Sequence, residues 1–424
     1  MQEDFLHYIW RYKKFNMAAI KTTNNEVVTI VSVGQHNQNS GPDFFNAQLK
    51  IGNQLWAGNV EIHKKSSDWF LHNHEQDKAY DTVILHVVWE HDTPVFRKNN
   101  SEIPTLELKS YISKCALNNY QQLFSKTKKW INCEQDFESV DSFIVKNWLE
   151  RLYVERLEQK AAIINRFLDA SKNDWEAVLF KMLAKNFGLK VNADAFLSMA
   201  NSIDYAVVRK QQHSQNNLEA LFFGQSGLLN TASEDAYFQN LLSQYQFLKQ
   251  KFKLSNSNIV PVQFFRLRPS NFPTIRLSQL ASLYGKESNL FSKINKVNTL
   301  DEFYTLFSVK ASSFWESHYT FDKVSKKSKK QLSKAFIDLL MINTIIPIKF
   351  AFAKQQGKHI EGRLMELIQQ ISPEKNGIIN KFNALKNLTS SALESQGLLQ
   401  LKREYCDKNK CLHCAIGTLL LNKN

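Results

Sequence analysis

Along roughly the first 112 residues, apolar side chains gather in short runs of β-branched and aromatic residues. Glycine, asparagine, aspartate or proline separates each run from the next, which is the pattern of strands joined by turns. The runs that fit strands are 27–31, 44–51, 55–63, 83–89 and 105–108. Gly52-Asn53, between the second and third runs, predicts a tight hairpin turn. Amphipathic patterns also predict an opening helix near residues 5–12 and another helix over 66–80.

From about residue 140 onward, the apolar positions follow the helical period of about 3.6 residues instead. Asp141 or Ser142 can cap the first such stretch, whose apolar positions are Ile144, Val145, Trp148, Leu149, Leu152 and Leu157. Similar patterns predict helices at 174–187, 194–210, 234–252, 276–284, 301–317, 328–353, 359–371 and 394–403. The sequence thus predicts an α+β or α/β fold, with a mixed-sheet domain over 1–112, a junction over 113–139 and a larger all-helical domain over 140–424.

The composition is that of a folded chain with a strongly basic charge. Of the 424 residues, 43% are hydrophobic, which excludes a disordered or collagen-like chain. Lysine and arginine number 54 against 40 aspartate and glutamate residues, so the net charge is +14. Such an excess favours nucleic acid as a partner, because neutralised phosphates release counterions; a merely solvated basic surface is the alternative. The side chains best placed for phosphate contact are Arg268, Arg276, Lys326, Lys327 and Lys330.

The hydropathy pattern predicts no membrane span. The most apolar stretch, 337–352, is interrupted by Asn343, Pro347 and Lys349 and is shorter than the ~20 residues that a span needs. The chain begins MQEDFLHYIW, with acidic residues where a signal peptide would be basic. We therefore expect a cytoplasmic protein that does not contact a membrane.

Histidines are concentrated in the amino-terminal part of the chain. Seven of the eleven lie within the first 91 residues: His7, His36, His63, His72, His74, His86 and His91. Imidazole is a common metal ligand and proton carrier, so this concentration indicates a candidate site. A zinc hydrolase centre for a substrate other than nucleic acid could be built from His63, His72, His74 and His86. The alternative is that these histidines are polar residues on surface loops.

Two carboxylates are expected to meet at the open end of the predicted hairpin. Asp43 precedes one strand, and Glu61 lies near the end of the other. Since side chains alternate along a strand, Glu61 and His63 share one face. Neighbouring carboxylates repel each other unless a cation lies between them, and oxygen ligands favour Mg²⁺ or Mn²⁺. The sequence therefore predicts a magnesium or manganese site at Asp43 and Glu61; a polar sheet face without metal is the alternative.

These residues resemble the motif of the PD-(D/E)XK nuclease superfamily. Asp43, which follows a proline, matches its first element, and the triplet 61–63 matches its second, with histidine at the usual position of lysine. The resemblance implies a metal-dependent nuclease for DNA or RNA in which Asp43 and Glu61 bind the metal. It also implies a third carboxylate from the first helix, Glu3, and a place for His63 near the scissile phosphate. Because the lysine is absent, a protein that binds nucleic acid without cleaving it is the alternative.

A second candidate metal site lies in the carboxyl-terminal part of the chain. The spacing Cys406-x4-Cys411-x2-Cys414 allows three thiolates to reach one metal. Candidates for the fourth ligand are, in order, Cys133, His413 and Cys115. Thiolates select Zn²⁺ or an iron–sulfur cluster over hard cations. The arrangement is similar to the cysteine staple of some PD-(D/E)XK nucleases, which place one cysteine ahead of three carboxyl-terminal ones. Ordinary buried thiols are the alternative.

Short motifs spread along the chain carry a further resemblance. They are YIW at 8–10, SGPDF at 40–44, VEIH at 60–63, SDW at 67–69, RPSNFP at 268–273, YC at 405–406 and CLHCAIG at 411–417. With these motifs the chain resembles, over nearly its full length, an uncharacterised bacterial family called domain of unknown function 2851. This resemblance supports the two-part architecture and implies no activity.

Overall fold

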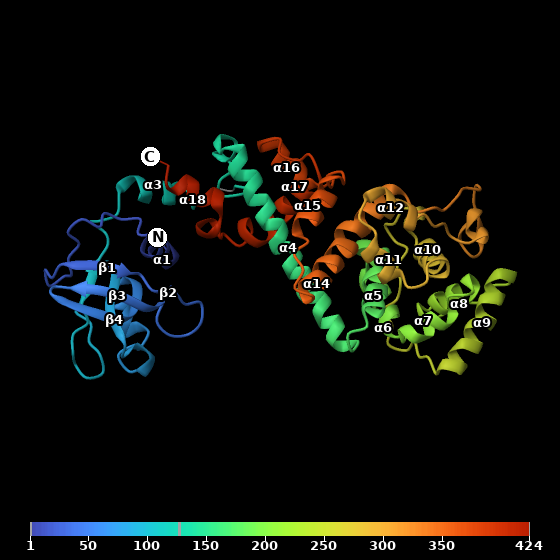
Figure 1. Ribbon diagram of the computed structural model, residues 1–424, viewed down its shortest axis with the longest axis horizontal. Helices are drawn as coiled ribbons and strands as arrows, with labels where there is room; N and C mark the ends of the chain where they lie inside the picture. Colours follow the sequence, from blue (N-terminus) through green and yellow to red (C-terminus); the bar gives the residue numbers. More distant parts are fainter. Residues whose placement is uncertain (1, 126–128, 424) are drawn as a thin grey trace. The chain divides into compact units, whose positions relative to one another are not determined.

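The computed structural model describes residues 2–125 and 129–423, and the chain divides into two compact units (Figure 1). The first unit is formed by the described residues of Met1–Trp148 and Leu401–Asn424, and the second by Leu149–Gln400. The predicted fold class is confirmed, because a mixed sheet in the amino-terminal part is followed by a larger helical region. The carboxyl-terminal residues, which carry three cysteines, pack with the first unit.

Among the described residues, six strands form the sheet of the first unit. They are β1 Val28–Ser32, β2 Gln35–His36, β3 Phe44–Ile51, β4 Gln54–Lys65, β5 Val83–Glu90 and β6 Thr105–Glu107. Their order is β1-β3-β4-β5-β6, and β2 also pairs with β3. The β1–β3 and β3–β4 pairs are antiparallel, whereas β4–β5 and β5–β6 are parallel. Six consecutive residues of β5 are buried, as expected of a strand with parallel neighbours and both faces covered.

The hairpin predicted around Gly52 is present. Gly52 joins β3 to β4 with a φ of +58°, in the left-handed region that favours glycine. Antiparallel pairing then aligns Phe44 with Val60 at the open end of the hairpin. This register places Asp43 next to Glu61, as the sequence predicts.

Helix α1 (Glu3–Arg11) packs against β4 and closes one side of this hairpin end. Its apolar face is buried, and Trp10 anchors it because its indole Nε1 donates to the carbonyl of Val33 at 3.1 Å. On the carboxyl-terminal side of the chain, α18 (Ala415–Leu421) packs against α3 (Lys114–Leu123). Asn422 then donates from Nδ2 to the Tyr8 hydroxyl of α1 at 2.9 Å. The end of the chain is therefore bonded to the helix that borders the hairpin.

A helix lies between residues 66 and 80, as predicted, but it is short. Helix α2 covers only Asp68–Leu71, and one 3-10 turn follows at Lys78–Tyr80. Asn73 adopts a φ of +58°, and a left-handed residue cannot continue a right-handed helix. The loop that replaces the helix returns two histidines to the face of β4.

The second unit is helical apart from a short hairpin of β7 (His318–Thr320) and β8 (Lys323–Val324). Helix α4 (Ser142–Ala170) begins in the first unit and continues into the second. The other helices of this unit are α5 Trp175–Phe187, α6 Leu189–Asn201, α7 Tyr205–Gln211, α8 Gln215–Gln225, α9 Ala236–Phe252, α10 Pro273–Lys286, α11 Leu290–Lys296, α12 Leu300–Leu306, α13 Lys334–Leu340, α14 Ile346–Gln355, α15 Glu361–Gln369, α16 Gly377–Leu385 and α17 Ala392–Gln400.

One helical run within the described residues, Lys334–Gln355, has the length and apolar composition of a membrane span. It joins α13 to α14 through a π-helical segment, Met341–Ile345. Of its most apolar window, 72% is buried inside the protein, as in the core helix of a folded domain. Lys349 in this run donates from Nζ to the carbonyl oxygens of Ile294 and Val297 at 3.0 and 2.7 Å. The run is thus packed as part of the helical core.

Candidate metal site of the first unit

The carboxylates of Asp43 and Glu61 each accept a hydrogen bond from a backbone amide on the opposite side of the hairpin. The backbone amide of Asp43 donates to Oε2 of Glu61 at 3.0 Å. The backbone amide of Ile62 in turn donates to Oδ2 of Asp43 at 3.0 Å. These bonds hold both carboxylates at the same end of β4, so the structure brings together the two residues that the sequence singles out.

Glu61 is strongly perturbed by this environment. The residue is only 5% exposed, and burial together with the nearby charge of Asp43 raises its pKa to about 9. The hydrogen bond from the Asp43 amide offsets only part of this effect. A buried carboxylate with so high a pKa is neutral in the free protein and becomes charged when a cation binds beside it. A cation bound beside Glu61 would lower this pKa and favour the charged form.

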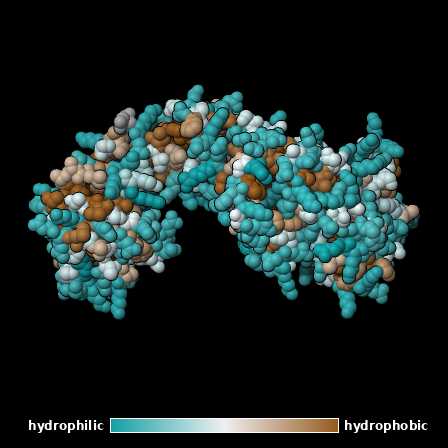
Figure 2. Space-filling model, in the orientation of Figure 1, coloured by the Kyte–Doolittle hydropathy of each residue, from teal (hydrophilic) through white to brown (hydrophobic). Residues whose placement is uncertain are grey.

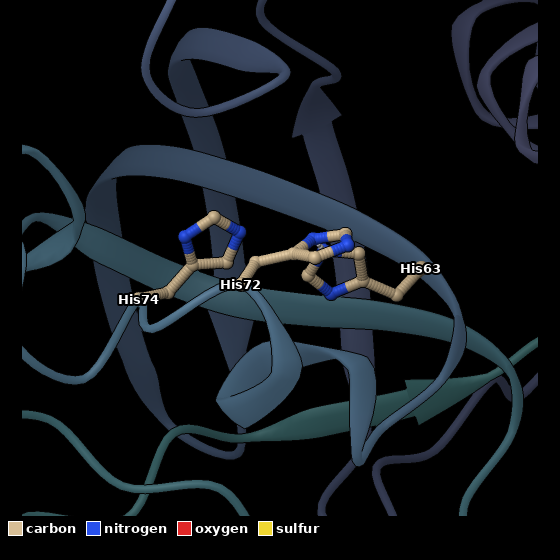
Figure 3. Close-up of side chains that lie close together, drawn as sticks. All are labelled: His63, His72 and His74. Carbon is tan, nitrogen blue, oxygen red and sulfur yellow. Dashed lines mark hydrogen bonds between the residues drawn. The ribbon is translucent and has the colours of Figure 1, made fainter.

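Three histidines come together beside Glu61 on β4, and Figure 3 shows their side chains. His63 projects from β4, His72 follows the end of α2, and His74 lies in the loop after it. One ring nitrogen from each lies within 4.8 Å of the others, a spacing that can hold a metal ion. The Nε2 atoms of His63 and His74 each lie 3.4 Å from Oε1 of Glu61. Two imidazoles and one carboxylate thus face a common point.

His74 has a ring nitrogen without a hydrogen-bond partner, which is consistent with a metal ligand at this position. Its Nε2 atom is buried and has no hydrogen-bond partner among the described residues, although a carboxylate oxygen lies close to it. The ring of Tyr80 stacks on His74 with centroids 3.7 Å apart, and Trp69 contacts it edge-on. A buried polar atom without a partner costs free energy. A metal ion bound to Nε2 would remove that cost.

His63 is held from behind by a second buried histidine. Its Nδ1 lies 2.9 Å from Nε2 of His86 on β5, and its Nε2 lies 3.2 Å from Nδ1 of His72. Burial, and then the charges of nearby histidines, lower the pKa of His63 to about 3. Burial likewise lowers the pKa of His86 well below its usual value. Both rings therefore favour the neutral form, and a proton on Nδ1 of His63 would leave the Nε2 lone pair facing His72 and Glu61.

Helix α1 contributes His7 and Glu3 to the edge of the site. The Nε2 atom of His7 lies 3.2 Å from Oδ2 of Asp43. Burial alone would lower the pKa of His7, but its interactions with Asp43 and Glu3 outweigh burial and raise it. Burial raises the pKa of Glu3, against the opposing charge of His7. His63 and His86 on the sheet thus favour the neutral form, whereas His7 on α1 favours the charged form.

Glu3, the predicted third carboxylate, lies on the same helix as His7. The sequence indicates His7 only as one of the clustered histidines and assigns it no role. The signal for His7 is present in the sequence, because residues four apart share a helix face and His7 follows Glu3 by four. The broken helix over 66–80 hides the positions of His72 and His74. Their contact with β4 depends on the left-handed Asn73, which the pattern of apolar positions does not reveal.

The basic residues predicted to contact phosphate differ in exposure. Arg276 is 7% exposed and donates to the side chains of Gln279 and Asn271, while burial lowers its pKa to about 10. Lys330 is 6% exposed, with its ammonium 3.9 Å from the ring centroid of Tyr319. Arg276 and Lys330 are therefore too buried to contact phosphate at the surface. The residues of this set that are exposed in the second unit are Arg268, Lys326 and Lys327.

The predicted cysteine ligands also come together. Cys133, Cys406, Cys411 and Cys414 line one pocket of the first unit. Cys115 is exposed on α3, and its sulfur lies 3.6 Å from the carbonyl oxygen of Lys423. The four cysteines that the sequence predicts as thiolate ligands therefore lie around one pocket.

Replacing Glu61 with glutamine is expected to remove a pH dependence of stability when no divalent cation is present. The folded-state pKa of Glu61, about 9, lies above its ordinary value of 4.5. Its stabilising contribution is therefore complete below about pH 4.5 and is lost as the pH rises toward 9. Since one pKa unit corresponds to about 1.4 kcal/mol, the total is on the order of a few kcal/mol.

Thermal unfolding in a chelator at several pH values measures this effect. Glu61→Gln should melt several degrees above the wild type at mildly alkaline pH, and the difference should shrink toward acidic pH. Glu26→Gln, at an exposed carboxylate of the same unit, is the matched control and should follow the wild type throughout. A constant difference between Glu61→Gln and the wild type would show that Glu61 does not titrate as inferred.

Comparison with known proteins identifies a family and no activity. No curated protein and no solved structure gives a significant match to this chain. The family described as "Protein of unknown function (DUF2851)" matches residues 3–377, a range that contains the hairpin site and ends before the three carboxyl-terminal cysteines. Because the match covers most of the 424 residues, the chain belongs to this DUF2851 family.

Proposed function

We propose that the first unit is a metal-dependent phosphodiester hydrolase that acts on DNA or RNA. The observation that carries the proposal is the pairing of Asp43 with Glu61 at the hairpin end, beside neutral histidines. The nuclease resemblance implies the order helix, strand, Asp strand, Glu strand, helix and strand, and the elements α1, β1, β3, β4, α2 and β5 follow that order.

In this proposal Asp43 and Glu61 hold the cation, and His63 and His74 complete its ligands or accept protons beside it. Imidazole ligands widen the choice of metal from Mg²⁺ to Mn²⁺ and other transition ions. When bound, such an ion polarises a phosphoryl oxygen and makes a bound water more acidic. Because His63 is neutral and its Nδ1 faces His86, its Nε2 has a lone pair that can bind the cation or accept a hydrogen bond from the attacking water.

The positive charge that lysine supplies in the usual motif would come from elsewhere in this chain. His7 is biased toward its charged form by Asp43 and faces the same carboxylate. Lys64, next to His63, is exposed, and its charge acts on Glu3. We propose that these two side chains offset the phosphate charge that develops during hydrolysis.

Nucleic acid is favoured as the substrate by the charge of the protein. The net charge is +14, and hydrophilic residues predominate on the face shown in Figure 2. Arg268, Lys326 and Lys327 are exposed cations that can contact phosphates in the second unit. Binding to nucleic acid should therefore weaken steeply as the salt concentration rises.

A second candidate function is favoured by the histidines. The nitrogen atoms of His63, His72 and His74 lie within 4.8 Å of one another, which suits Zn²⁺ with three histidine ligands and an open position for water. A zinc hydrolase for a substrate other than nucleic acid would use this centre. This zinc hydrolase differs from the nuclease in its metal. Its activity should also be unaffected when the exposed lysine and arginine residues are replaced by neutral ones.

The purified full-length protein, stripped of metal and incubated with labelled single- and double-stranded DNA and RNA, tests these alternatives. Cleavage on adding Mg²⁺ or Mn²⁺ is the result expected of a nuclease. Salt-sensitive binding without cleavage under any metal would indicate a nucleic-acid-binding protein that lacks catalysis. Neither binding nor cleavage, together with Zn²⁺-dependent hydrolysis of simple carboxylic esters, would establish the second candidate and overturn the first.

A further inference from the structure

A cavity of about 570 Å³ lies in the first unit, between α1, the start of α3 and the end of α18 (Figure 1). Sites for small molecules typically have volumes of about 300–1,000 Å³. The buried side chains in its walls are mainly apolar: Phe5, Ile9, Phe15, Ile112 and Leu421. The exposed part of its lining is mostly polar or charged. The cavity therefore has the size and the mixed lining of a small-molecule site, and the proposed hydrolase makes no use of it.

All the charged side chains that line this cavity are cations. They are Lys13, Lys14 and Lys423, and no aspartate or glutamate of the described chain lines it. None of the three ammonium groups forms an ion pair within residues 2–125 and 129–423. Cations gathered around a concave surface raise the local concentration of anions, because the low-dielectric walls focus their field. The ligand that this lining favours therefore carries negative charge.

Tyr8 supplies a further hydrogen-bond donor at the cavity wall. Its side chain is buried, and its hydroxyl accepts a hydrogen bond from Nδ2 of Asn422 at 2.9 Å. Asn422 lines the cavity as well, so the hydroxyl lies at the wall that the two residues share. In the described part of the chain, the O–H of Tyr8 meets no acceptor. A buried donor without an acceptor costs free energy, and an anionic oxygen in the cavity would remove that cost.

The wall formed by Tyr111 suits a flat ring. Tyr111 is half-buried, and its hydroxyl accepts a hydrogen bond from the backbone amide of Lys21 at 3.1 Å. Its backbone carbonyl accepts a second from the amide of Asn16 at 2.9 Å. A tyrosine fixed at both ends provides a rigid surface on which a base can stack. The exposed side chains of Asn16 and Ser110 add an amide and a hydroxyl that can bond to the edge of a base or to a sugar.

We propose that this cavity binds a nucleoside phosphate, either as a free nucleotide or as the end nucleotide of a strand. The phosphate lies among the three lysines and accepts the hydrogen bond of Tyr8, while the base stacks on Tyr111. A lipid with an anionic head is disfavoured, because its tail needs an apolar tunnel and the exposed lining is mostly polar. Binding requires no divalent cation and does not depend on the proposed hydrolase activity.

Helix α1 separates this cavity from the hairpin site. Successive residues of a helix are about 100° apart around its axis. Phe5, Tyr8 and Ile9, which line the cavity, therefore lie on the opposite side of α1 from Glu3 and His7. A ligand in the cavity thus braces the helix that carries the edge of the hairpin site. Backbone amides of α1 should exchange their hydrogens more slowly when the ligand is bound.

Equilibrium binding to the full-length protein in a chelator tests the proposal, because the chelator keeps divalent cations out of the hairpin site. We expect adenosine monophosphate to bind, and adenosine to bind about tenfold or more weakly because it lacks the phosphate. Inorganic phosphate should also bind more weakly, because it lacks the base. Equal binding of adenosine and adenosine monophosphate would overturn the proposal.

A dinucleotide, with and without a 5′-phosphate, distinguishes the two sources of the ligand. Tight binding of the phosphorylated dinucleotide without binding of adenosine monophosphate assigns the cavity to the end of a strand. The reverse result assigns it to a free nucleotide. If neither adenosine monophosphate nor the phosphorylated dinucleotide binds, the proposal is wrong.

Replacing two of the lysines should weaken this binding in steps. Lys14→Gln and Lys423→Gln change exposed side chains, so neither should disturb the fold. Each should weaken the binding of adenosine monophosphate by about tenfold, the loss expected of one hydrogen bond to a charged group. Lys98→Gln, at an exposed lysine of the same unit that does not line the cavity, is the matched control. Unchanged binding by the double variant would show that the nucleotide binds elsewhere.

Cys115 reports directly on the cavity, because it lines the cavity and is the exposed cysteine of the five. Adenosine monophosphate should slow the reaction of Cys115 with N-ethylmaleimide several-fold, and prior alkylation should block nucleotide binding. Asp43→Asn should show the same protection, so this test holds whether or not the hairpin site is a hydrolase. Equal alkylation rates with and without saturating nucleotide would exclude the cavity as its binding site.

Discussion

Asp43→Asn is expected to abolish divalent-dependent cleavage while leaving the fold intact. The asparagine side-chain oxygen can still accept the hydrogen bond from the Ile62 amide, so the hairpin end should keep its geometry. The substitution removes one of the two negative charges that hold the cation. Losing a metal ligand and its charge should lower the rate at saturating substrate by roughly 100-fold or more. This loss should persist at high metal concentration, because the cation would also be misplaced.

Rates measured for Asp43→Asn across a series of Mn²⁺ concentrations check this expectation. Asp77→Asn is a matched control, since Asp77 is exposed and accepts a backbone hydrogen bond from Ala79 just as Asp43 does from Ile62. Asparagine caps a turn as well as aspartate does, so the control should cleave at the wild-type rate. Wild-type cleavage by Asp43→Asn would remove the main support for the nuclease proposal.

The parts of the site that could be predicted from sequence are those that depend on local geometry. A glycine turn and the alternation of side chains along two strands are enough to bring Asp43 beside Glu61. The concentration of histidines in the first 91 residues is by itself enough to indicate a site. In each case residues close in sequence, or paired through one hairpin, carry the information.

The parts that could not be predicted depend on distant contacts or on single backbone angles. The apolar pattern over 66–80 fits a helix, but the left-handed Asn73 ends it early and turns the following loop toward β4. Arg276 is basic and flanked by loop residues, which suggests a surface position. Its burial depends on the ring of Phe336, sixty residues away, 3.6 Å from the guanidinium carbon. Neither the backbone angle of Asn73 nor the contact between Arg276 and Phe336 produces a periodic pattern in the sequence.

The role of His63 can be read from the pH dependence of cleavage. Its pKa of about 3 means that the wild-type ring is neutral across the physiological range, so its own titration should not limit the rate there. If His63 is the base, His63→Gln should lower the rate at saturating metal by about 100-fold or more, equally at every pH. His359→Gln, at a nearly fully exposed histidine of the second unit, is the control and should have no effect.

His63→Lys is the more informative variant, because it restores the residue of the usual motif. Lysine is charged below its ordinary pKa of about 10.4 and can act as a base only after losing its proton. The variant should therefore be slow at neutral pH and gain about tenfold in rate per pH unit as the pH rises. If the motif instead requires a cation at this position, His63→Lys should equal or exceed the wild type at neutral pH. That outcome would assign His63 a charge-stabilising position and leave the proton to another group, for which His74, with its unpartnered Nε2 beside Glu61, has the right geometry.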